Sequence, residues 1–180
     1  MNQDRRKDPQ RRVLAEGHFA RLVAQHGWEW VERVNSTGAV VIVALTAQRE
    51  LVLVEQYRIP LQRRVLDLPA GLAGDEPGTH GEDLAAAARR ELLEETGFVA
   101  PRLEFLNEGP SSAGLASETY ALFLARDAQR VAAGGGDDKE DIQVHVVPLA
   151  EITTWLDARR QSGVMIDPKI FAALYFAQNR

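Results

Sequence analysis

The chain has 180 residues, of which 45% are hydrophobic and 26% charged, with no cysteine and a net charge of −5. This length and composition fit one globular domain. The lack of cysteine excludes disulfides and thiolate metal sites, and the acidic balance argues against binding to nucleic-acid backbones. No apolar run approaches the ~20 residues of a membrane-spanning helix, and no apolar region follows the basic N-terminus as in a secretory signal. A cytoplasmic protein with no membrane partner is expected.

The first part of the chain, residues 1–37, is expected to form an arm and one strand. Its first dozen residues are polar and charged, which predicts an arm without structure of its own. The stretch "WEWVERV" alternates as a strand does, so Trp28 and Trp30 share one face of it. The two indoles either pack in a core or dimer interface, which is the simpler interpretation, or form a platform on which a nucleotide base stacks.

Three strands are predicted next. "GAVVIVALT" (38–46) is a β-branched run typical of a strand buried on both faces. "ELVLVEQYR" (50–58) follows a short polar turn and is expected to be its hairpin partner. "VLDLPAG" (65–71) predicts a further short strand that ends at Pro-Ala-Gly.

A loop rich in glycine and acids (72–81) leads to a predicted helix over residues 82–97. Its acidic start suits the positive end of the helix dipole, and Gly97 is well placed to end it. Two strand candidates follow, "RLEFLNE" and "TYALFLAR", and then a glycine-rich loop with the acidic run "DDKED". A strand (142–147), in which His145 is interpreted as structural, precedes two helices (149–161 and 168–178). The pattern predicts an α/β fold with a sheet between helices.

Three glutamates gather in the last turns of the central helix. Glu91, Glu94 and Glu95 are spaced i, i+3 and i+4, so they share one side of the helix, where they repel one another and the helix dipole. They form either a solvated acidic face or a set of oxygen ligands for Mg²⁺ or Mn²⁺. Such a cation would bind and polarise the phosphates of a substrate. The backbone carbonyl of Ala70 and the acidic cluster over 137–141 offer further oxygen ligands.

The stretch "EDLAAAARRELLEETGF" resembles the Nudix box. The family has a glycine six residues before the first glutamate of the box, where this chain has Glu76; a few inserted residues in the loop restore Gly71 to that role. The resemblance covers about residues 38–178 and implies a Nudix α/β/α sandwich with a mixed central sheet. The matching positions are Glu82, Arg90, Glu91, Glu94, Glu95 and Gly97, followed by the apolar Phe98.

The box implies hydrolysis of a nucleoside diphosphate that is linked to another moiety. Its helix would hold Mg²⁺ through Glu91 and Glu95, with Glu94 a third ligand and the Ala70 carbonyl a fourth. Arg90 would hold these carboxylates in place by ion pairing, which its i,i+4 spacing to Glu94 also allows.

Other stretches resemble the ADP-ribose and nucleotide-sugar pyrophosphatases of this family: "LVEQYRIP", "LDLPAG" and "EDIQVHVVPLAEITTWL". The resemblance places Arg58 near the substrate and the general base in the acidic loop, as Asp138 or Glu140. Glu118 would be an outer metal or ribose contact, or else an acid that only ends a turn. Members of this branch are commonly homodimers that exchange N-terminal strands, which residues 1–37 would fit.

One departure bears on the substrate. The Ser-Pro-Gly proline that ADP-ribose enzymes carry beyond the box corresponds to Ala113, and Pro110 comes three residues too early. GDP-mannose and other nucleotide sugars therefore stay open beside ADP-ribose.

The sequence predicts Mg²⁺-dependent cleavage of the diphosphate in ADP-ribose or a nucleotide sugar, to a nucleoside monophosphate and a sugar phosphate. Alternatives are a Nudix hydrolase of dinucleoside polyphosphates, capped RNA or oxidised nucleotides, and a nucleotide-sugar-binding module without catalysis. The full set of glutamates argues against a module that only binds.

Overall fold

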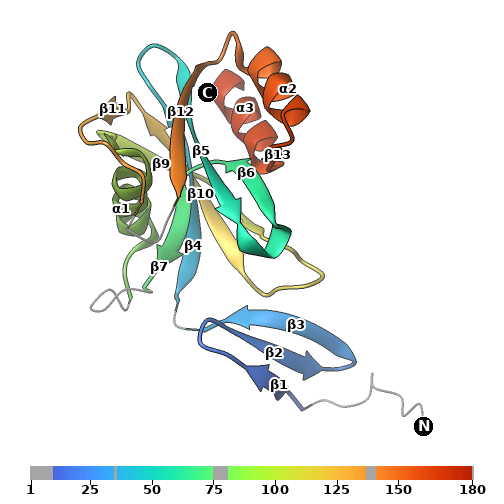
Figure 1. The fold of residues 1–180 in the computed structure, drawn as a ribbon. Coiled ribbons are helices and arrows are strands. Elements are labelled where there is room, and N and C mark those ends of the chain that lie inside the picture. The colour runs from blue at the N-terminus through green and yellow to red at the C-terminus, as the bar shows by residue number, and fades with distance from the viewer. Residues whose placement is uncertain (1–9, 35, 75–80, 137–140, 180) are drawn as a thin grey trace.

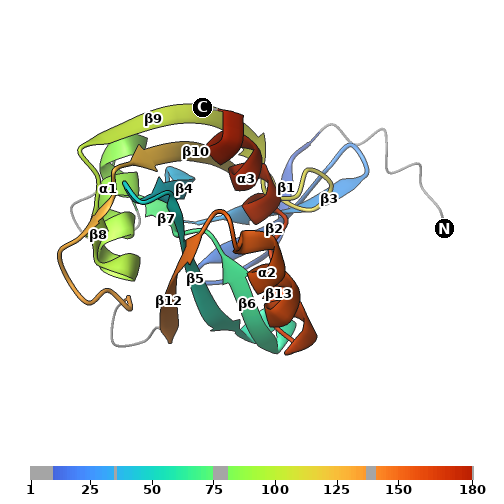
Figure 2. The ribbon, with the colours of Figure 1, turned by 90° about the horizontal axis from the view of Figure 1, so that it is seen from above.

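The computed structural model describes residues 10–34, 36–74, 81–136 and 141–179 (Figure 1). A mixed sheet lies between helix α1 (Leu84–Thr96) on one face and helices α2 (Ile152–Gln161) and α3 (Lys169–Asn179) on the other, as Figures 1 and 2 show. The predicted α/β/α sandwich is therefore confirmed. None of the described helices is long and apolar enough to cross a membrane.

The main sheet has eight strands in the order β13-β6-β5-β4-β10-β9, with β12 on β5 and β7 on β4. The pairs β4–β10 and β6–β13 are parallel and the others are antiparallel, so the sheet is mixed as predicted. Its strands are β4 (Gly38–Leu45), β5 (Glu50–Arg58), β6 (Arg63–Asp67), β7 (Ala70–Ala73), β9 (Arg102–Pro110), β10 (Thr119–Arg126), β12 (Ile142–Pro148) and β13 (Met165–Ile166). The small elements outside it are the 3₁₀ turn η2 (Ile59–Leu61) and the pair β8 (Phe98–Val99) and β11 (Gln129–Arg130).

The hairpin predicted for β4 and β5 is short. The two strands pair at only two positions, Ala44 with Val52 and Leu45 with Leu51, and then diverge. β4 continues against β7, while β5 continues between β6 and β12. Because β5 diverges, β4 can pair with β7, which begins within the Pro-Ala-Gly stretch.

The single strand predicted over 65–71 is wrong, because this stretch forms the end of β6 and the start of β7. Leu68 and Pro69 separate the two strands. Proline has no N–H to donate to a strand ladder, so a strand interior does not accommodate it. Pro69 still contributes its carbonyl, which accepts a hydrogen bond from the Ile42 N–H of β4 at 2.8 Å.

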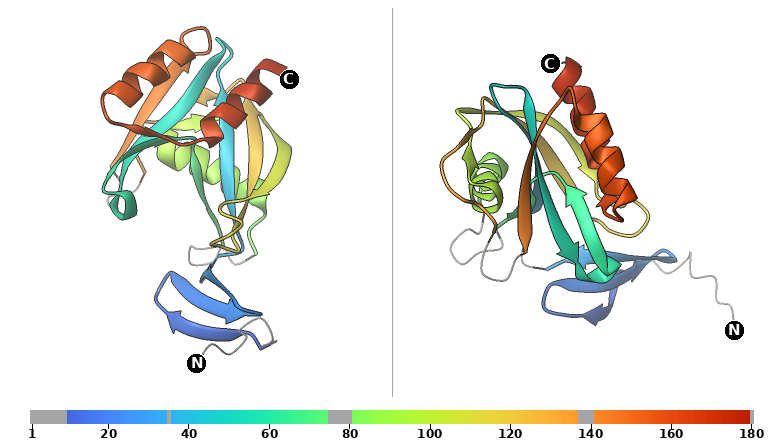
Figure 3. Two further views of the ribbon diagram at one scale, coloured as in Figure 1. Left: turned by 90° about the vertical axis from the view of Figure 1, so that its right-hand side faces the viewer. Right: turned by 45° about the horizontal axis from the view of Figure 1, so that its top comes forward.

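The N-terminal region forms a separate three-stranded sheet, seen beside the main sheet in Figures 1 and 3. Its strands are β1 (Arg12–Glu16), β2 (Ala20–Gln25) and β3 (Trp28–Arg33), of which only β3 was predicted. The turn between β2 and β3 consists of His26 and Gly27, both with positive φ. This is the two-residue hairpin turn whose backbone twist matches paired strands. The His-Gly pair was the signal that sequence reasoning missed.

The core occupies both faces of the main sheet. Alternate residues of β4 point to opposite faces, and Val40 to Leu45 are all buried, which confirms the prediction for this strand. One cluster packs under α2 and α3, where Leu66, Leu124 and Ile170 are fully buried. The other packs under α1, where small alanines let the helix lie close to the sheet.

Candidate active site

Helix α1 carries the box glutamates and is fixed at both ends. The Asp83 carboxylate accepts from the N–H groups of Ala85 and Ala86 (3.1 and 3.3 Å), as an N-cap does. Gly97 ends the helix with φ 74°. A Cβ there would stand 2.1 Å from the Ala132 carbonyl oxygen, so only glycine allows this approach.

Two of the three glutamates lie against the first residues of β7. Glu95 is 4% exposed, and its Oε2 accepts from the Ala70 N–H at 2.9 Å. Glu91 lies over Gly71, where an added Cβ would stand 1.9 Å from the Glu91 Cδ. The structure therefore brings Ala70 and both carboxylates together, and Gly71 provides the space for this contact.

Arg90 ties the acidic groups of the box to one another. Its guanidinium pairs with Glu82, Glu91 and Glu94 at 3.2, 2.9 and 3.0 Å, and donates to the Leu72 carbonyl at 2.8 Å. Burial lowers the pKa of Arg90, but these carboxylates outweigh it and raise the pKa well above its ordinary value. The side chain of Glu94 is 46% exposed, so it lies at the edge of the group.

These residues fit a hard divalent cation, although they do not form a preformed cage. Among the described residues no three aspartate, glutamate or histidine side chains converge as a ready metal site. Glu91 and Glu95 nevertheless present carboxylate oxygens to one cavity beside Ala70, and oxygen ligands suit Mg²⁺ and Mn²⁺. Because Gly71 has no side chain, the space that a Cβ would fill is occupied by the Glu91 carboxylate.

A cavity of about 410 Å³ opens in front of these carboxylates. Arg58 and Glu118, which the sequence placed near the substrate, both line it, so the structure brings them to Glu91 and Glu95. The cavity is also lined by residues that sequence reasoning missed, among them Arg33, Asp67 and Lys169.

Glu118 is held by an arginine of the N-terminal sheet. Arg33, the last residue of β3, donates from Nε and Nη2 to Glu118 Oε1 at 3.0 and 2.9 Å. Next to this pair, Ser117 N donates to the Val31 carbonyl at 3.1 Å. The N-terminal sheet thus contributes a cationic side chain to the wall of the cavity.

Asp67 and Lys169 form a second ion pair in the wall. Lys169 Nζ lies 3.1 Å from Asp67 Oδ2 and 2.6 Å from Asp167 Oδ2. Burial raises the pKa of Asp67. The pKa of Lys169 is lowered by burial but raised overall by the two aspartates. The pair joins the end of β6 to the start of α3, which are far apart in the sequence, so no local pattern indicated it.

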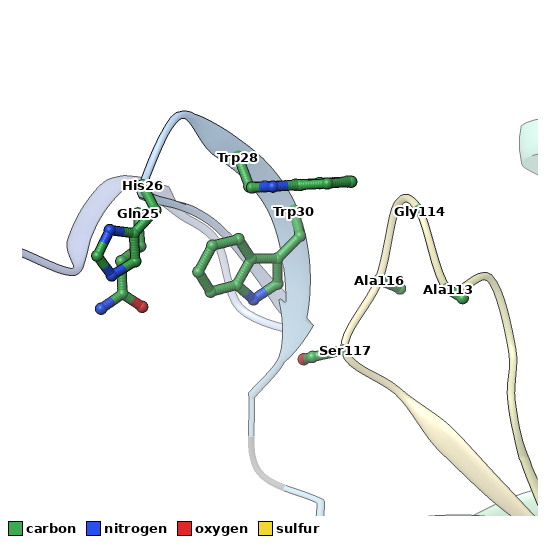
Figure 4. A pocket seen from close by; sticks show the side chains of 8 residues that line it. All are labelled: Gln25, His26, Trp28, Trp30, Ala113, Gly114, Ala116 and Ser117. Atoms are coloured by element: carbon green, nitrogen blue, oxygen red, sulfur yellow. The ribbon is translucent and has the colours of Figure 1, made fainter. Parts of the chain in front are cut away.

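Trp28 and Trp30 line a different cavity of about 450 Å³, between the N-terminal sheet and the loop that contains Ala113 and Gly114 (Figure 4). The indole of Trp28 is largely exposed. Arg33 follows at an odd spacing from both tryptophans, and so faces the other side of β3. In one chain the structure therefore does not bring the tryptophans to the carboxylates.

The two residues predicted as general base, Asp138 and Glu140, lie outside the described residues. The chain on their N-terminal side is described: Gly136 N donates to the Glu94 carbonyl at 3.1 Å, at the end of α1. On their C-terminal side, Asp141 pairs with Arg64 at 2.6 Å. His145 packs against Trp155 with ring centroids 5.1 Å apart, which agrees with its structural interpretation.

Comparisons with known proteins agree with this arrangement. The family model of the NUDIX domain matches residues 35–167. The chain is 32% identical to the methanol dehydrogenase activator of Bacillus methanolicus and 30% identical to the ADP-ribose pyrophosphatase of Bacillus subtilis (strain 168), each over 82% of this chain and 75% of the relative. It is 31% identical to the GDP-mannose pyrophosphatase of Cronobacter sakazakii, over 88% of this chain and 81% of the relative.

A solved structure shares the fold. The crystal structure of an ADP compounds hydrolase superposes with a TM-score of 0.67 at 24% identity, over 94% of this chain and 90% of that one. The chain belongs to the Nudix family. It is a Nudix hydrolase.

Proposed function

We propose that this enzyme hydrolyses the diphosphate of ADP-ribose or of a nucleotide sugar, giving a nucleoside monophosphate and a sugar phosphate. The observation that carries the proposal is the composition of the 410 Å³ cavity, where Glu91 and Glu95 share the wall with Arg58 and Arg33. Carboxylates suit a cation and guanidinium groups suit phosphate oxygens, so together they fit a metal-bound diphosphate. The similarity to ADP-ribose and GDP-mannose pyrophosphatases supports the same substrate class.

Glu91, Glu95 and the Ala70 carbonyl would hold Mg²⁺, or Mn²⁺ in its place, with Glu94 as a further ligand from the edge. Such a cation neutralises phosphate charge and lowers the pKa of a water molecule bound to it. Arg90 keeps the carboxylates oriented through its ion pairs, and Arg58 would hold the diphosphate by charged hydrogen bonds. Glu118 would be an outer metal contact or a ribose contact.

Asp138 or Glu140 would act as general base. It takes a proton from the attacking water, whose oxygen bonds to one phosphorus while the bridging P–O bond breaks. The other phosphate leaves with the bridging oxygen. Support comes from the residue just before this acidic segment: Gly136 N donates to the Glu94 carbonyl at the end of α1.

We further propose that the protein is a cytoplasmic homodimer in which the N-terminal sheet meets a second copy. Val13, Leu14 and Phe19 of this sheet or its turns are 45%, 44% and 72% exposed. A small sheet needs a packed apolar face for stability. A second copy would cover these exposed side chains, with or without strand exchange, and would bring Trp28 and Trp30 to the nucleotide base of the substrate. Sedimentation at several concentrations tests the dimer.

The first experiment is release of nucleoside monophosphate from ADP-ribose, GDP-mannose and UDP-glucose, with and without Mg²⁺. Metal-dependent turnover of at least one is expected, and the relative rates rank the sugars. Turnover only of dinucleoside polyphosphates, capped RNA or oxidised nucleotides would replace the proposed substrate class. Tight binding of a nucleotide sugar without turnover would indicate a binding module.

A further inference from the structure

One carboxylate of the N-terminal sheet holds the indole of Trp30. Trp30 Nε1 donates to Glu32 Oε1 at 3.0 Å. The two residues are two apart on β3, so their side chains lie on the same face of the small sheet. The torsion that turns a tryptophan ring has broad minima, so the side chain alone orients the ring only loosely. A hydrogen bond at the edge of the indole selects one orientation.

Glu32 is itself held by two arginines. Its other oxygen, Oε2, accepts from Arg21 Nε of β2 at 2.9 Å and from Arg11 Nη2 at 2.5 Å. Burial raises the pKa of Glu32, but its three hydrogen bonds outweigh this and lower the pKa below its ordinary value. Because the arginines engage one oxygen, the carboxylate presents the other oxygen to Trp30.

Stability alone is a weak explanation for this arrangement. The side chains of Arg11 and Arg21 are 41% and 33% exposed. Ion pairs of exposed side chains typically contribute little to the free energy of unfolding. The orientation of the indole is the more specific consequence of the three contacts.

The backbone beside Trp30 is tied to the loop that faces it. Val31 N donates to the Leu115 carbonyl at 2.8 Å, and Ser117 N donates to the Val31 carbonyl at 3.1 Å. Trp30 on β3 and Ser117 on this loop both line the 450 Å³ cavity (Figure 4). Trp30 is therefore fixed relative to the cavity both at its backbone and at the edge of its ring.

Trp28 has different surroundings, although it lines the same cavity. It follows the two-residue turn between β2 and β3, and its side chain is 63% exposed. Of the two tryptophans, Trp30 is thus the one whose ring is set by a neighbouring side chain.

We infer that Glu32 is a positioning residue for the nucleotide base of the substrate, because it holds the Trp30 indole in the orientation on which the base stacks. Stacking requires that the two ring planes face one another, so it depends on the orientation of the indole. The inference rests on the proposed function, in which the tryptophans meet the base.

The test is Glu32→Leu, which removes the acceptor and keeps a side chain of similar size. We expect KM for the nucleotide sugar to rise about 10-fold, because a base stacks poorly on a misoriented ring. The turnover number kcat should change little, because the lost contact binds substrate and transition state alike. Unchanged KM would overturn the inference.

Glu16→Leu is the matched control. Glu16 is a second acid beside Arg21, at 3.8 Å, but it lies on β1, which is not a neighbour of β3. Its KM and kcat should equal those of the wild type. A rise in KM as large as that of Glu32→Leu would assign the effect to the charge of the sheet and overturn the inference.

Product inhibition separates the base from the phosphates. The nucleoside monophosphate product, AMP or GMP according to the preferred substrate, carries a base, whereas inorganic pyrophosphate carries none. In Glu32→Leu the inhibition constant of the monophosphate should rise, and that of pyrophosphate should stay unchanged. Equal weakening of both inhibitors would contradict a role at the base.

A second variant, Trp30→Phe, keeps an aromatic ring but has no N–H to donate. If Glu32 acts through this donor, adding Glu32→Leu to Trp30→Phe should raise KM no further. An additive rise would show that Glu32 affects substrate binding by another route.

Hydrogen exchange of the indole N–H groups, followed by NMR, needs no activity. The chain has three tryptophans, so Trp→Phe variants can assign the three signals. In the wild type the indole N–H of Trp30 should exchange more slowly than that of the exposed Trp28. Equal exchange would refute the positioning by Glu32, even if Glu32→Leu failed to fold or no nucleotide sugar were hydrolysed. A protected Trp30 in a wild type that is inactive on every nucleotide sugar would instead refute the proposed function, and with it the contact to a base.

Discussion

The three box glutamates have different surroundings although they share one helix. Glu95 is buried and bonded to the Ala70 N–H, Glu91 lies over Gly71, and Glu94 is half exposed beside Arg90. Residues three and four apart on a helix are neighbours, which the sequence shows. The order of burial depends on where β7 passes the helix, which the sequence does not show.

Glu95→Gln should reduce turnover by more than ~100-fold, because the proposed metal ligand loses its charge. Mutation of a residue that only orients a metal ligand commonly costs roughly 10- to 100-fold, and a ligand itself should cost more. The amide oxygen can still accept from the Ala70 N–H, so the melting temperature should change little. Steady-state kinetics and thermal unfolding check this, with the exposed Glu108→Gln on β9 as control. Near-wild-type turnover would rule out a metal-ligand role.

Gly71→Ala should displace Glu91, since the new Cβ would stand 1.9 Å from the Glu91 Cδ. We expect a loss of turnover of roughly 10- to 100-fold, and a higher Mg²⁺ requirement, from misplacement of one carboxylate. Gly109→Ala is the matched control, because a Cβ there meets nothing nearer than 3.8 Å. Equal effects of the two changes would contradict this function of Gly71.

Asp138→Asn and Glu140→Gln should differ strongly. The general base is the residue whose loss lowers kcat while Mg²⁺ affinity is kept, because it accepts a proton without binding the metal. Mg²⁺ titrations of activity for both variants measure this. Unchanged kcat in both would place the base on helix α1.

At the scale of elements, α1 depends on its two ends. The sequence predicted the helix over 82–97, and it spans Leu84–Thr96 with Asp83 as N-cap and Gly97 after the last turn. The capping signals are local, so they could be recognised without a structure. By contrast, Pro69 marks where the stretch 65–71 breaks, but only the structure shows that β6 then pairs with β5 and β7 with β4.

Asp83→Ala should destabilise the protein by about 1 kcal/mol, because the N–H groups of Ala85 and Ala86 lose their acceptor. For a domain of this size that corresponds to a fall of roughly 2–4 °C in Tm. Asp83→Ser should restore most of it, since serine also caps. Thermal unfolding decides, and an unchanged Tm in Asp83→Ala would mean that the cap is not needed.

At the scale of the whole molecule, the stability of the protein at acid pH should depend on Glu55 of β5. This buried carboxylate pairs with Arg64, His145 and Arg159. Burial raises the pKa of Glu55, but Arg64, Arg159 and His145 together lower it below the ordinary 4.5. An acid with a depressed pKa contributes stability above its unfolded-state pKa and loses it as pH falls through the folded-state value. Part of the stability should therefore be lost below about pH 4.5.

Glu55→Gln should lower Tm at neutral pH, because it leaves two guanidinium groups without their shared carboxylate. It should also flatten the fall in Tm between about pH 6 and pH 3, since this titration is removed. Melting curves across that range measure both effects. A variant with the same pH dependence as the wild type would assign the acid sensitivity to other carboxylates.

The sequence by itself determined the elements whose signals are local. These are the box helix with its acidic start and Gly97 at its end, and β4, which is buried on both faces. They also include the order of strand and helix patterns, which predicted an α/β fold, and the spaced acids that match the Nudix box. Such signals arise from neighbours along the chain, so they need no knowledge of the sheet.

Only the tertiary structure decided which distant residues meet. It brought Arg33 to Glu118, Lys169 to Asp67 and Arg64 to Asp141. It also separated the tryptophan cavity from the carboxylate cavity, although β3 and the loop over 111–118 contribute residues to both. Strand order and the face that each strand turns to its neighbours set these contacts, and both depend on packing of the whole chain.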